Sequence, residues 1–417
     1  MLQSQALEPR AASSACSPLQ NPESARRGNR TGPKLEARSL KPGFETENTE
    51  RGRLMPSRTQ SGSPHIQFAK LRSGAKYNLA SSGVMSYPLA ELPVRLENLE
   101  INGSDAYGHA PLQERLARLN GVPPERVVAA AGTSMANHLA MAATVEPGDE
   151  VLVEHPTYET LVSALEYLGA SIRYFERRME DGFRVDPEEV ERKITPRTRL
   201  IVMTNLHNPS GALVEDETLR ALADVAKRSN ALVLVDEVYL EALFEQRPRP
   251  SFHLGEQFLV TSSLTKAYGL SGLRCGWVLA APELAQRMWH INDLYGVNAA
   301  HPAELLSVIA LDNLGRAAAR AKQLLDTNRR TLDAFLRSRS DLEYCQPEFG
   351  VIIFPKLRRG SVDELYRLLT EKYETAVVPG RYFDMPQHFR VGIGGDPEMT
   401  RAGLERLGLA LDELGQE

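Results

Sequence analysis

The chain has 417 residues, of which 42% are hydrophobic and 25% charged, with a formal net charge of −5. This length favours two domains, and the charge gives no reason to expect a nucleic acid or an anionic membrane as a partner. No apolar run approaches the ~20 residues of a membrane span. Three widely spaced cysteines argue against a disulfide framework or a zinc site and favour a reducing compartment, so we expect a cytoplasmic protein.

The first 72 residues differ in composition from the rest. They are rich in Ser, Pro, Arg and Gly, basic residues outnumber acidic ones, and apolar residues show almost no periodicity. Such a segment cannot bury enough surface to offset its ordering entropy, so we expect a disordered N-terminal extension or arm over residues 1–72. Within it, residues 65–71 could pack on a partner subunit, and a translation start at Met55 is an alternative.

From residue 73 onward, short β-branched runs alternate with segments of helical period. Residues 216–228, for example, place Leu219, Leu222 and Ala226 on one stripe. The alternation predicts a large α/β domain over residues 73–300, with three layers in which helices cover both sides of a mostly parallel sheet. Strands are expected at residues 127–131, 151–154, 172–175, 200–204, 232–236, 258–262 and 277–280.

The pattern changes near residue 300, where a long helical segment begins. Asp396 and Pro397 form a typical helix start, with an N-cap carboxylate and a proline in the first turn. We expect a smaller C-terminal α/β domain over residues 301–417, against which the first ~25 residues of the large domain pack. Its helices are expected at residues 302–339, 361–373 and 397–414, and its strands at 351–354, 376–378 and 389–393.

Polar residues stand where several predicted strands end. Ligands of open α/β sheets bind at the carboxyl ends of the strands, and Asn208, Asp236 and Lys266 each lie at or just past such an end. Lys266 stands among small hydroxyl residues, with Ser263 before it and Arg274 after it in a glycine-rich setting. A lysine that forms a Schiff base with a cofactor aldehyde, beside groups that hold a phosphate, requires these parts.

Three further positions suggest bound charges. A buried carboxylate at Asp236 is costly unless paired; a protonated pyridine nitrogen would pair with it, and bonding to neighbouring backbone is the alternative. Residues 132–134 follow a strand and open a helix, which makes either an anion site or an ordinary N-cap. Arg390 lies in an apolar strand, where its guanidinium suits either a carboxylate ligand or a structural salt bridge.

Taken together, these motifs resemble the pyridoxal-phosphate (PLP) aminotransferases of class I/II, the aspartate-aminotransferase-like family of fold type I. The similarity extends from about residue 76 to 412 and includes Asn-Pro-Ser-Gly at Asn208 and Asp-Glu-Val-Tyr at Asp236. The matching positions follow the family's order: Tyr107, Gly132, Thr133, Ser134, Tyr158, Asn208, Asp236, Tyr239, Ser263, Lys266, Arg274 and Arg390.

The resemblance implies fold type I, PLP as cofactor and a role for each matching residue. Lys266 would be the Schiff-base lysine and general base, Asp236 would hold the ring nitrogen, and Tyr239 and Asn208 would bind the ring oxygen. Tyr158 would stack on the ring, and the phosphate would be held by Gly132, Thr133, Ser134, Ser263 and Arg274.

The resemblance also implies how substrate and subunits meet. Arg390 would bind the substrate α-carboxylate, while Gly83, together with Asn208, would line the substrate side. Tyr107 would reach the phosphate of the neighbouring subunit, which implies a C2 homodimer. The expected reaction moves an amino group between an amino acid and a 2-oxo acid in ping-pong order, with Lys266 carrying the α-proton.

Other readings remain open. The same scaffold supports C–S β-elimination, synthase and decarboxylase chemistry, and Tyr295, Asn298 and His301 do not identify the substrate. A regulator with a DNA-binding N-terminal module is a rival of another class, but residues 1–72 lack the apolar period of a helix-turn-helix. The nine histidines show no metal-ligand spacing, so we expect no metal, and we expect no nucleic-acid or membrane partner.

Overall fold

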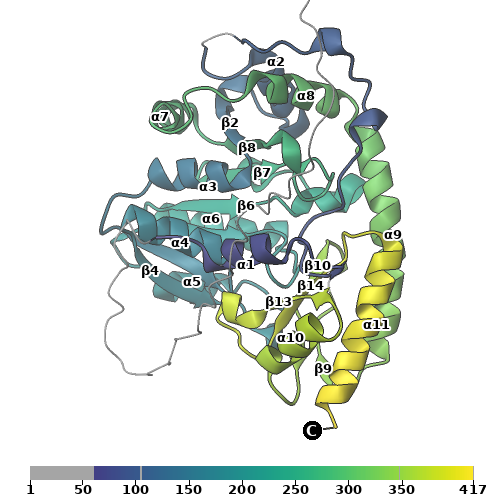
Figure 1. Cartoon of the computed structure of the whole chain (residues 1–417). Coiled ribbons are helices and arrows are strands. Elements are labelled where there is room, and N and C mark those ends of the chain that lie inside the picture. Colours follow the sequence, from purple (N-terminus) through teal and green to yellow (C-terminus); the bar gives the residue numbers. More distant parts are fainter. Residues whose placement is uncertain (1–60, 104–105, 347, 417) are drawn as a thin grey trace, which may run out of the picture. The chain divides into compact units, whose positions relative to one another are not determined.

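A seven-stranded sheet lies at the centre of the fold (Figure 1). The computed structural model describes residues 61–103, 106–346 and 348–416, so the disorder predicted over residues 1–72 lies outside the described residues as far as residue 60 and is wrong for residues 64–72, which are helical. Within the sheet only β8 runs antiparallel to its neighbours. In sheet order the strands are β2 (Val127–Ala131), β8 (Cys275–Leu279), β7 (Phe258–Ser263), β6 (Leu232–Asp236), β5 (Thr198–Thr204), β3 (Glu150–His155) and β4 (Ser171–Glu176).

The predicted α/β fold with a mostly parallel sheet is confirmed. Every strand expected between residues 127 and 280 is present, and its ends agree with the prediction to within two residues. The central strands are buried on both faces, which explains why their sequences are continuous apolar runs rather than alternating ones.

Helices cover both faces of the sheet and make three layers. Residues such as Val153 and Leu234 point to one face, and Ile201 and Val233 point to the other. The first face is packed by α3 (Thr133–Ala142), α4 (Glu159–Leu168) and α7 (Pro282–Asn292). The second is packed by α5 (Pro187–Lys193), α6 (Asp216–Arg228), α2 (Ala110–Asn120) and α8 (His301–Asp312).

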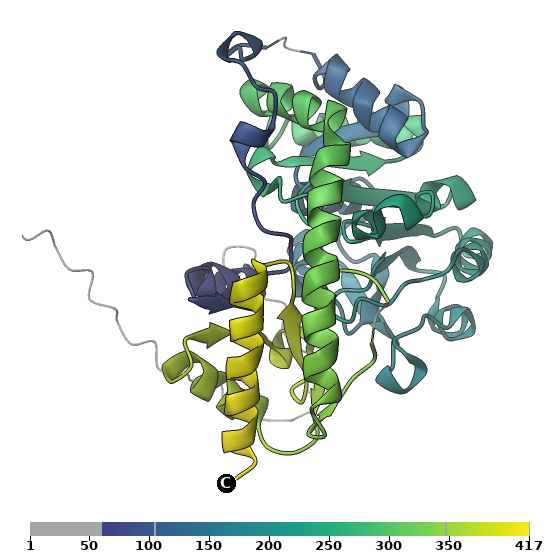
Figure 2. The same ribbon diagram turned by 90° about the vertical axis from the view of Figure 1, so that its right-hand side faces the viewer.

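The long helix expected over residues 302–339 is two helices, α8 and α9 (Leu314–Arg337). Asn313 has non-helical dihedrals, φ −120° and ψ 17°, and its side-chain amide donates to the Ile309 carbonyl at 2.8 Å. This side chain satisfies a carbonyl of the last turn and so ends α8. The apolar stripe of α9 packs beside α11 (Pro397–Leu414), and the two helices run side by side in Figure 2.

The remaining C-terminal elements are short. The strands here are two residues long, except one of four residues, and they pair in three small sheets. These elements are β9 (Leu342–Glu343), β10 (Ile352–Ile353), β11 (Lys356–Leu357), α10 (Val362–Glu371), β12 (Thr375–Ala376), β13 (Val378–Pro379) and β14 (Phe389–Gly392). Parallel pairing of β1 (Tyr77–Asn78) with β12 joins the segment after residue 73 to this part of the chain.

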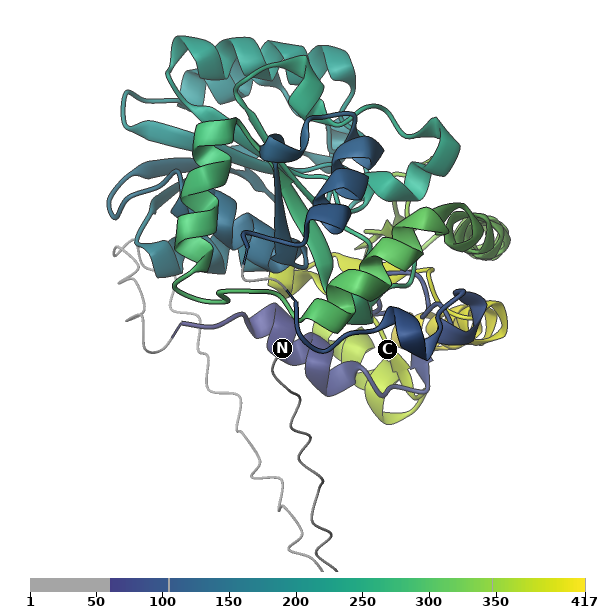
Figure 3. The same cartoon turned by 90° about the horizontal axis from the view of Figure 1, so that it is seen from above.

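Residues 64–72, which the sequence assigned to an extension or arm, form helix α1 (Pro64–Arg72). The Ser63 side chain accepts from the Ile66 N–H and so caps the helix. His65 and Phe68, three residues apart, are buried against the same chain rather than left free for a partner. Figure 3 shows α1 beside the C-terminal elements. No helix among the described residues is long and apolar enough to cross a membrane.

Candidate active site

The chain topology brings the predicted site residues to one edge of the sheet. Strands β2, β5, β6 and β7 all end there, and they deliver the loops that carry Gly132, Asn208, Asp236 and Lys266. Because β8 is antiparallel, its first residue, which follows Arg274, pairs with the last residue of β2 at this same edge. Residues far apart in sequence therefore meet around one cavity.

The cavity at this edge has a volume of about 330 Å³. It lies over the carboxyl ends of the strands, between α3, α4 and the N-terminal helix α1. Of the predicted residues, it is lined by Thr133, Ser134, Tyr158, Asn208, Asp236, Tyr239, Lys266 and Arg274. The other lining residues are Ile66, Lys70, Asn137, Thr204, Val238 and Thr265.

A buried carboxylate stands at the base of the cavity. Asp236 accepts from the Asn137 side-chain amide at 2.8 Å and from the Val238 backbone N–H at 3.1 Å. Asn137 is held in turn by the Thr261 hydroxyl, which donates to its carbonyl. Burial raises the pKa of Asp236 to about 6, while these two hydrogen bonds and the Lys266 charge oppose that rise. The carboxylate is thus prepared for a cationic partner that the protein does not itself supply.

Lys266 and Tyr239 face each other across the cavity. The Lys266 ammonium donates to the Ser82 hydroxyl at 2.7 Å and lies 5.9 Å from the centre of the Tyr239 ring. The Tyr239 hydroxyl is buried and has no hydrogen-bond partner in the described part of the chain. Gly83 lies against Lys266: a Cβ at that position would come within 3.4 Å of the lysine backbone and side chain.

Small residues and hydroxyls gather at the N-terminus of α3. Gly132 has a left-handed φ of 80°, and a Cβ there would collide with the Arg274 guanidinium, so glycine is required for the close approach. The Thr133 hydroxyl donates to the Ser263 hydroxyl at 2.8 Å, and Arg274 donates to the Ala131 carbonyl at 3.0 Å. Exposed N–H groups, hydroxyls and a guanidinium together make a site for an anion such as phosphate.

Arg390 is a buried cation beside the same cavity. Only 2% of the residue is exposed, and it has no acidic partner among the residues that the structure describes. Its Nη1 donates to the Asn208 side-chain carbonyl at 2.8 Å, whereas its Nε is buried without a partner. The guanidinium stands over the Phe383 ring at 5.3 Å. A buried, unpaired guanidinium with a free donor is arranged to bind an anion.

Tyr107 is the predicted site residue that does not join the others. It is 52% exposed and its hydroxyl donates to Asp293 at 3.1 Å, away from the residues that line the cavity. Such an exposed aromatic ring is compatible with a role across a subunit interface, which a single chain does not reveal.

Sequence reasoning missed several residues of this site. Asn137 and Thr204 gave no signal, because a single Asn in a helix and a single Thr at a strand end are common. Thr204 accepts from the Asn208 backbone N–H at 2.9 Å and so fixes that turn. The contributions of Ile66 and Lys70 were hidden because their segment was assigned to an extension.

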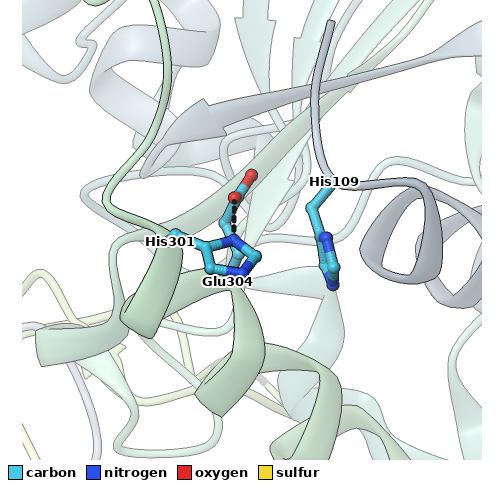
Figure 4. Close-up of side chains that lie close together, drawn as sticks. All are labelled: His109, His301 and Glu304. Carbon is cyan, nitrogen blue, oxygen red and sulfur yellow. Dashed lines mark hydrogen bonds and ion pairs between the residues drawn. The ribbon is translucent and has the colours of Figure 1, made fainter. Parts of the chain in front are cut away.

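A second cluster of polar side chains lies outside this cavity (Figure 4). His109, His301 and Glu304 place one potential ligand atom each within 4.8 Å of the others, a proximity that their sequence spacing could not show. His301 Nδ1 lies 3.4 Å from a Glu304 oxygen, and this contact gives each of the two side chains a polar partner. His109 occupies the N-cap position of α2 and His301 begins α8, and the positive ends of two helices disfavour a cation, so we assign no metal here.

Comparisons with known proteins agree with this geometry. The family model for aminotransferase class I and II matches residues 95–407. Capreomycidine synthase of Streptomyces vinaceus is 32% identical over 357 residues, which cover 82% of this chain and 90% of that protein. Arginine–pyruvate transaminase of Pseudomonas aeruginosa is 29% identical over 329 residues, 75% of this chain and 82% of that protein.

A solved structure gives the same result at the level of the fold. The crystal structure of a PLP-dependent aminotransferase from Streptococcus suis is 26% identical, with a TM-score of 0.80 that covers 85% of this chain and 98% of that one. Fold and site therefore define a PLP-dependent enzyme of fold type I. More particularly, the chain belongs to the class I and II aminotransferase family.

The residues present fit the cofactor of this family, pyridoxal phosphate. Two observations carry the fit: among the described residues, the buried Tyr239 hydroxyl has no hydrogen-bond partner, and the buried Asp236 carboxylate has no cation bonded to it. A buried carboxylate, an amine and an anion site line one cavity, and these are the groups that would hold the ring nitrogen, the aldehyde and the phosphate of PLP.

Proposed function

We propose that this protein is an aminotransferase that moves an amino group between an amino acid and a 2-oxo acid. When bound, PLP supplies an electron sink that stabilises negative charge at the substrate α-carbon. The observation that carries the proposal is the buried Arg390 guanidinium, which has a free Nε and stands beside the cavity that holds Lys266. An amino-acid carboxylate satisfies that charge and directs the α-carbon toward the lysine amine.

The proposed roles of the other residues follow from their positions. Asp236, held by Asn137, keeps a proton on the cofactor ring nitrogen, and the Tyr239 hydroxyl bonds the ring oxygen together with Asn208. Tyr158 covers the ring face. The phosphate is held at the start of α3 by Gly132, Thr133, Ser134, Ser263 and Arg274.

Lys266 is the proposed base. Its ammonium already bonds the Ser82 hydroxyl, which holds the amine on the side of Gly83 and the substrate. With the amine free, its Nζ would take the proton from the substrate α-carbon and hold it for return, a transfer that a single flexible side chain can perform. The Ser82 hydroxyl would orient the charged amine while it holds that proton.

Steady-state kinetics with the PLP-loaded protein test this function. Single amino acids are paired with pyruvate or 2-oxoglutarate, and consumption of the acceptor is followed. The proposal predicts parallel double-reciprocal lines, because the amino acid leaves as its 2-oxo acid before the acceptor binds. Intersecting lines, or product formation beyond one equivalent per site without any acceptor, would contradict a transamination cycle.

A synthase is the second candidate, because capreomycidine synthase shares 32% identity over 82% of the chain. Such a reaction uses the same electron sink but loses or adds a substituent instead of exchanging the amino group. It would convert an amino acid without an acceptor, and mass spectrometry of the product would show retention of the α-nitrogen.

We also propose a homodimer and the division of the chain into a large domain of residues 73–300 and a small domain of residues 301–417. Support for the dimer comes from Tyr107, which is exposed and lies outside its own cavity. In the proposed dimer this tyrosine contacts the phosphate of the neighbouring site, as its family resemblance implies.

A further inference from the structure

Helix α1 contributes a wall to the candidate active site. Ile66 and Lys70, four residues apart and hence on one face of the helix, line the cavity. His65 and Phe68 lie on the face turned to the protein interior. The start of the helix is anchored at the other side of the site, where the Ser63 hydroxyl contacts the Glu159 carboxylate at 2.5 Å at the beginning of α4.

His65 is enclosed by aromatic rings that belong to the site. Its imidazole meets the Tyr158 ring edge-on at 5.5 Å, stacks on Tyr382 at 5.7 Å and meets Phe383 edge-on at 5.3 Å. Tyr158 lines the cavity, and the Arg390 guanidinium stands over the other contact, Phe383. The imidazole therefore contacts the ring-covering tyrosine and shares the Phe383 ring with the proposed carboxylate-binding arginine, whose charge acts on it.

One nitrogen of this imidazole lacks a partner. Only 2% of His65 is exposed, and its Nδ1 is buried without a hydrogen bond to any described residue. Burial, followed by the charges of Arg390 and Lys266, lowers the pKa of His65 to about 2, so the ring is neutral. A neutral imidazole carries one N–H donor and one acceptor, and leaving a buried polar atom unpaired is costly.

We propose that His65 is a substrate-binding residue, which donates a hydrogen bond from its free ring nitrogen to the carboxylate held by Arg390. The inference rests on the proposed function, since it requires an amino-acid substrate at Arg390. A neutral donor is favourable at this position because a second full positive charge would be repelled by Arg390. A neutral N–H group adds an oriented hydrogen bond without that repulsion.

The test compares two variants of the PLP-loaded protein. His65→Phe keeps an aromatic ring among Tyr158, Tyr382 and Phe383 but removes the hydrogen bond, and His65→Gln keeps a polar donor. The probe is 2-methylalanine, an amino acid without an α-proton, whose binding is read as a change in the visible absorbance of the loaded protein. KM for the best amino-acid donor is measured in parallel.

We expect His65→Phe to raise the Kd of 2-methylalanine and the KM of the donor at least about tenfold, the loss typical of a hydrogen bond to a charged group. His65→Gln should recover most of the affinity. His388→Phe is the matched control: His388 is equally buried, at 3% exposure, and neither of its ring nitrogens has a partner among the described residues. It stacks on Phe354 and lines a separate pocket beside Lys356. This variant should leave Kd and KM unchanged.

The outcomes separate two failures. If wild-type protein binds 2-methylalanine and both His65 variants bind it equally well, His65 has no role in substrate binding and only this inference is overturned. If His65→Phe does not fold, as judged by its thermal midpoint, the result with His65→Gln decides. A more than tenfold loss of affinity for 2-methylalanine in His65→Gln, or unfolding of that variant too, would contradict a donor role. If loaded wild-type protein responds to no amino acid, the proposed function itself is wrong.

Discussion

Burial of the Asp236 carboxylate lowers the stability of the protein and prepares this group to bind the cofactor. It is 4% exposed, and its hydrogen bonds come from Asn137 and from backbone rather than from a cation. Burial of an ionised group is unfavourable, so the cofactor-free protein is expected to be less stable with this charge than without it. A cationic ring nitrogen removes that cost, which couples cofactor binding to stability.

The raised pKa of Asp236 gives a prediction with a defined sign. Because burial raises it from an ordinary 3.8 to about 6, the unfolded chain binds fewer protons between these values. Stability of the cofactor-free protein contributed by this group is present below about pH 4 and is lost as the pH rises through 6. Relative to wild type, Asp236→Asn should therefore gain about 2 kcal/mol in free energy of unfolding between pH 4 and pH 7.

Urea unfolding of both cofactor-free proteins at these two pH values measures the difference, in which the titration of all other groups cancels. In the same variant, turnover of the loaded enzyme should fall about 10²–10³-fold, because the ring nitrogen loses its charged partner. An equal pH dependence in wild type and Asp236→Asn would show that the carboxylate is not buried as described.

At the scale of elements, a buried ion pair connects two strand ends to the site. Arg177, after β4, donates to Glu154 of β3 at 2.6 Å, and both side chains have no exposed surface. Glu154 in turn accepts from the Thr204 N–H at 2.8 Å and from its hydroxyl at 2.6 Å. Thr204 ends β5 and holds the turn of Asn208, so this network fixes the proposed ligand of Arg390.

Removing one member of this pair should be strongly destabilising. Arg177→Met leaves the Glu154 charge buried and is expected to cost about 3–5 kcal/mol of unfolding free energy. Arg192→Met is the control, since the ion pairs of Arg192, with Asp186 at 3.6 Å and Glu188 at 3.8 Å, are exposed and their loss should cost at most about 1 kcal/mol. The denaturant midpoints of Arg177→Met and Arg192→Met are compared. If they agree within experimental error, the buried pair has no structural role.

The elements also show what sequence could and could not predict. The strands of the sheet were predicted because buried parallel strands are continuous β-branched runs, and α6 because its apolar stripe has a helical period. The break at Asn313 was not, because a side chain that ends a helix through its own i−4 carbonyl leaves the apolar pattern intact. Helix α1 was missed because its core contacts, His65 and Phe68, are few and its flanking composition is polar.

The same distinction holds for the site. Residues at strand ends, such as Asp236 and Lys266, could be anticipated because parallel topology brings those ends together. Asn137 and Ser82 could not be anticipated. Asn137 reaches the site from helix α3 and Ser82 from the loop that follows β1, and only tertiary packing places them there. The Glu154–Arg177 pair had no sequence signature either.

At the scale of the whole molecule, the exposed Tyr107 sets a test for the proposed dimer. Tyr107→Ala and Lys266→Ala should each inactivate a homodimer. A mixed dimer, produced by co-expression with two affinity tags, combines one intact Lys266 with the intact Tyr107 of the other subunit at a single site. Activity near half that of wild type is expected, because one of its two sites is complete.

If Tyr107 instead served the site of its own chain, the mixed dimer would hold no complete site and would be as inactive as either parent. Sedimentation velocity on the wild-type protein provides the accompanying check. A monomer with full activity at the assay concentration would contradict the proposed assembly directly.

The central claim, that Lys266 and PLP perform transamination, is tested most directly by a single half-reaction. Wild-type protein loaded with PLP is titrated with one amino acid at a time, without a 2-oxo acid acceptor, while absorbance and products are followed. We predict conversion of the visible band to a near-ultraviolet band with one equivalent of 2-oxo acid per site, and no visible lysine-linked band in Lys266→Ala. A visible band that persists while ammonia or pyruvate accumulates over many turnovers would contradict the claim.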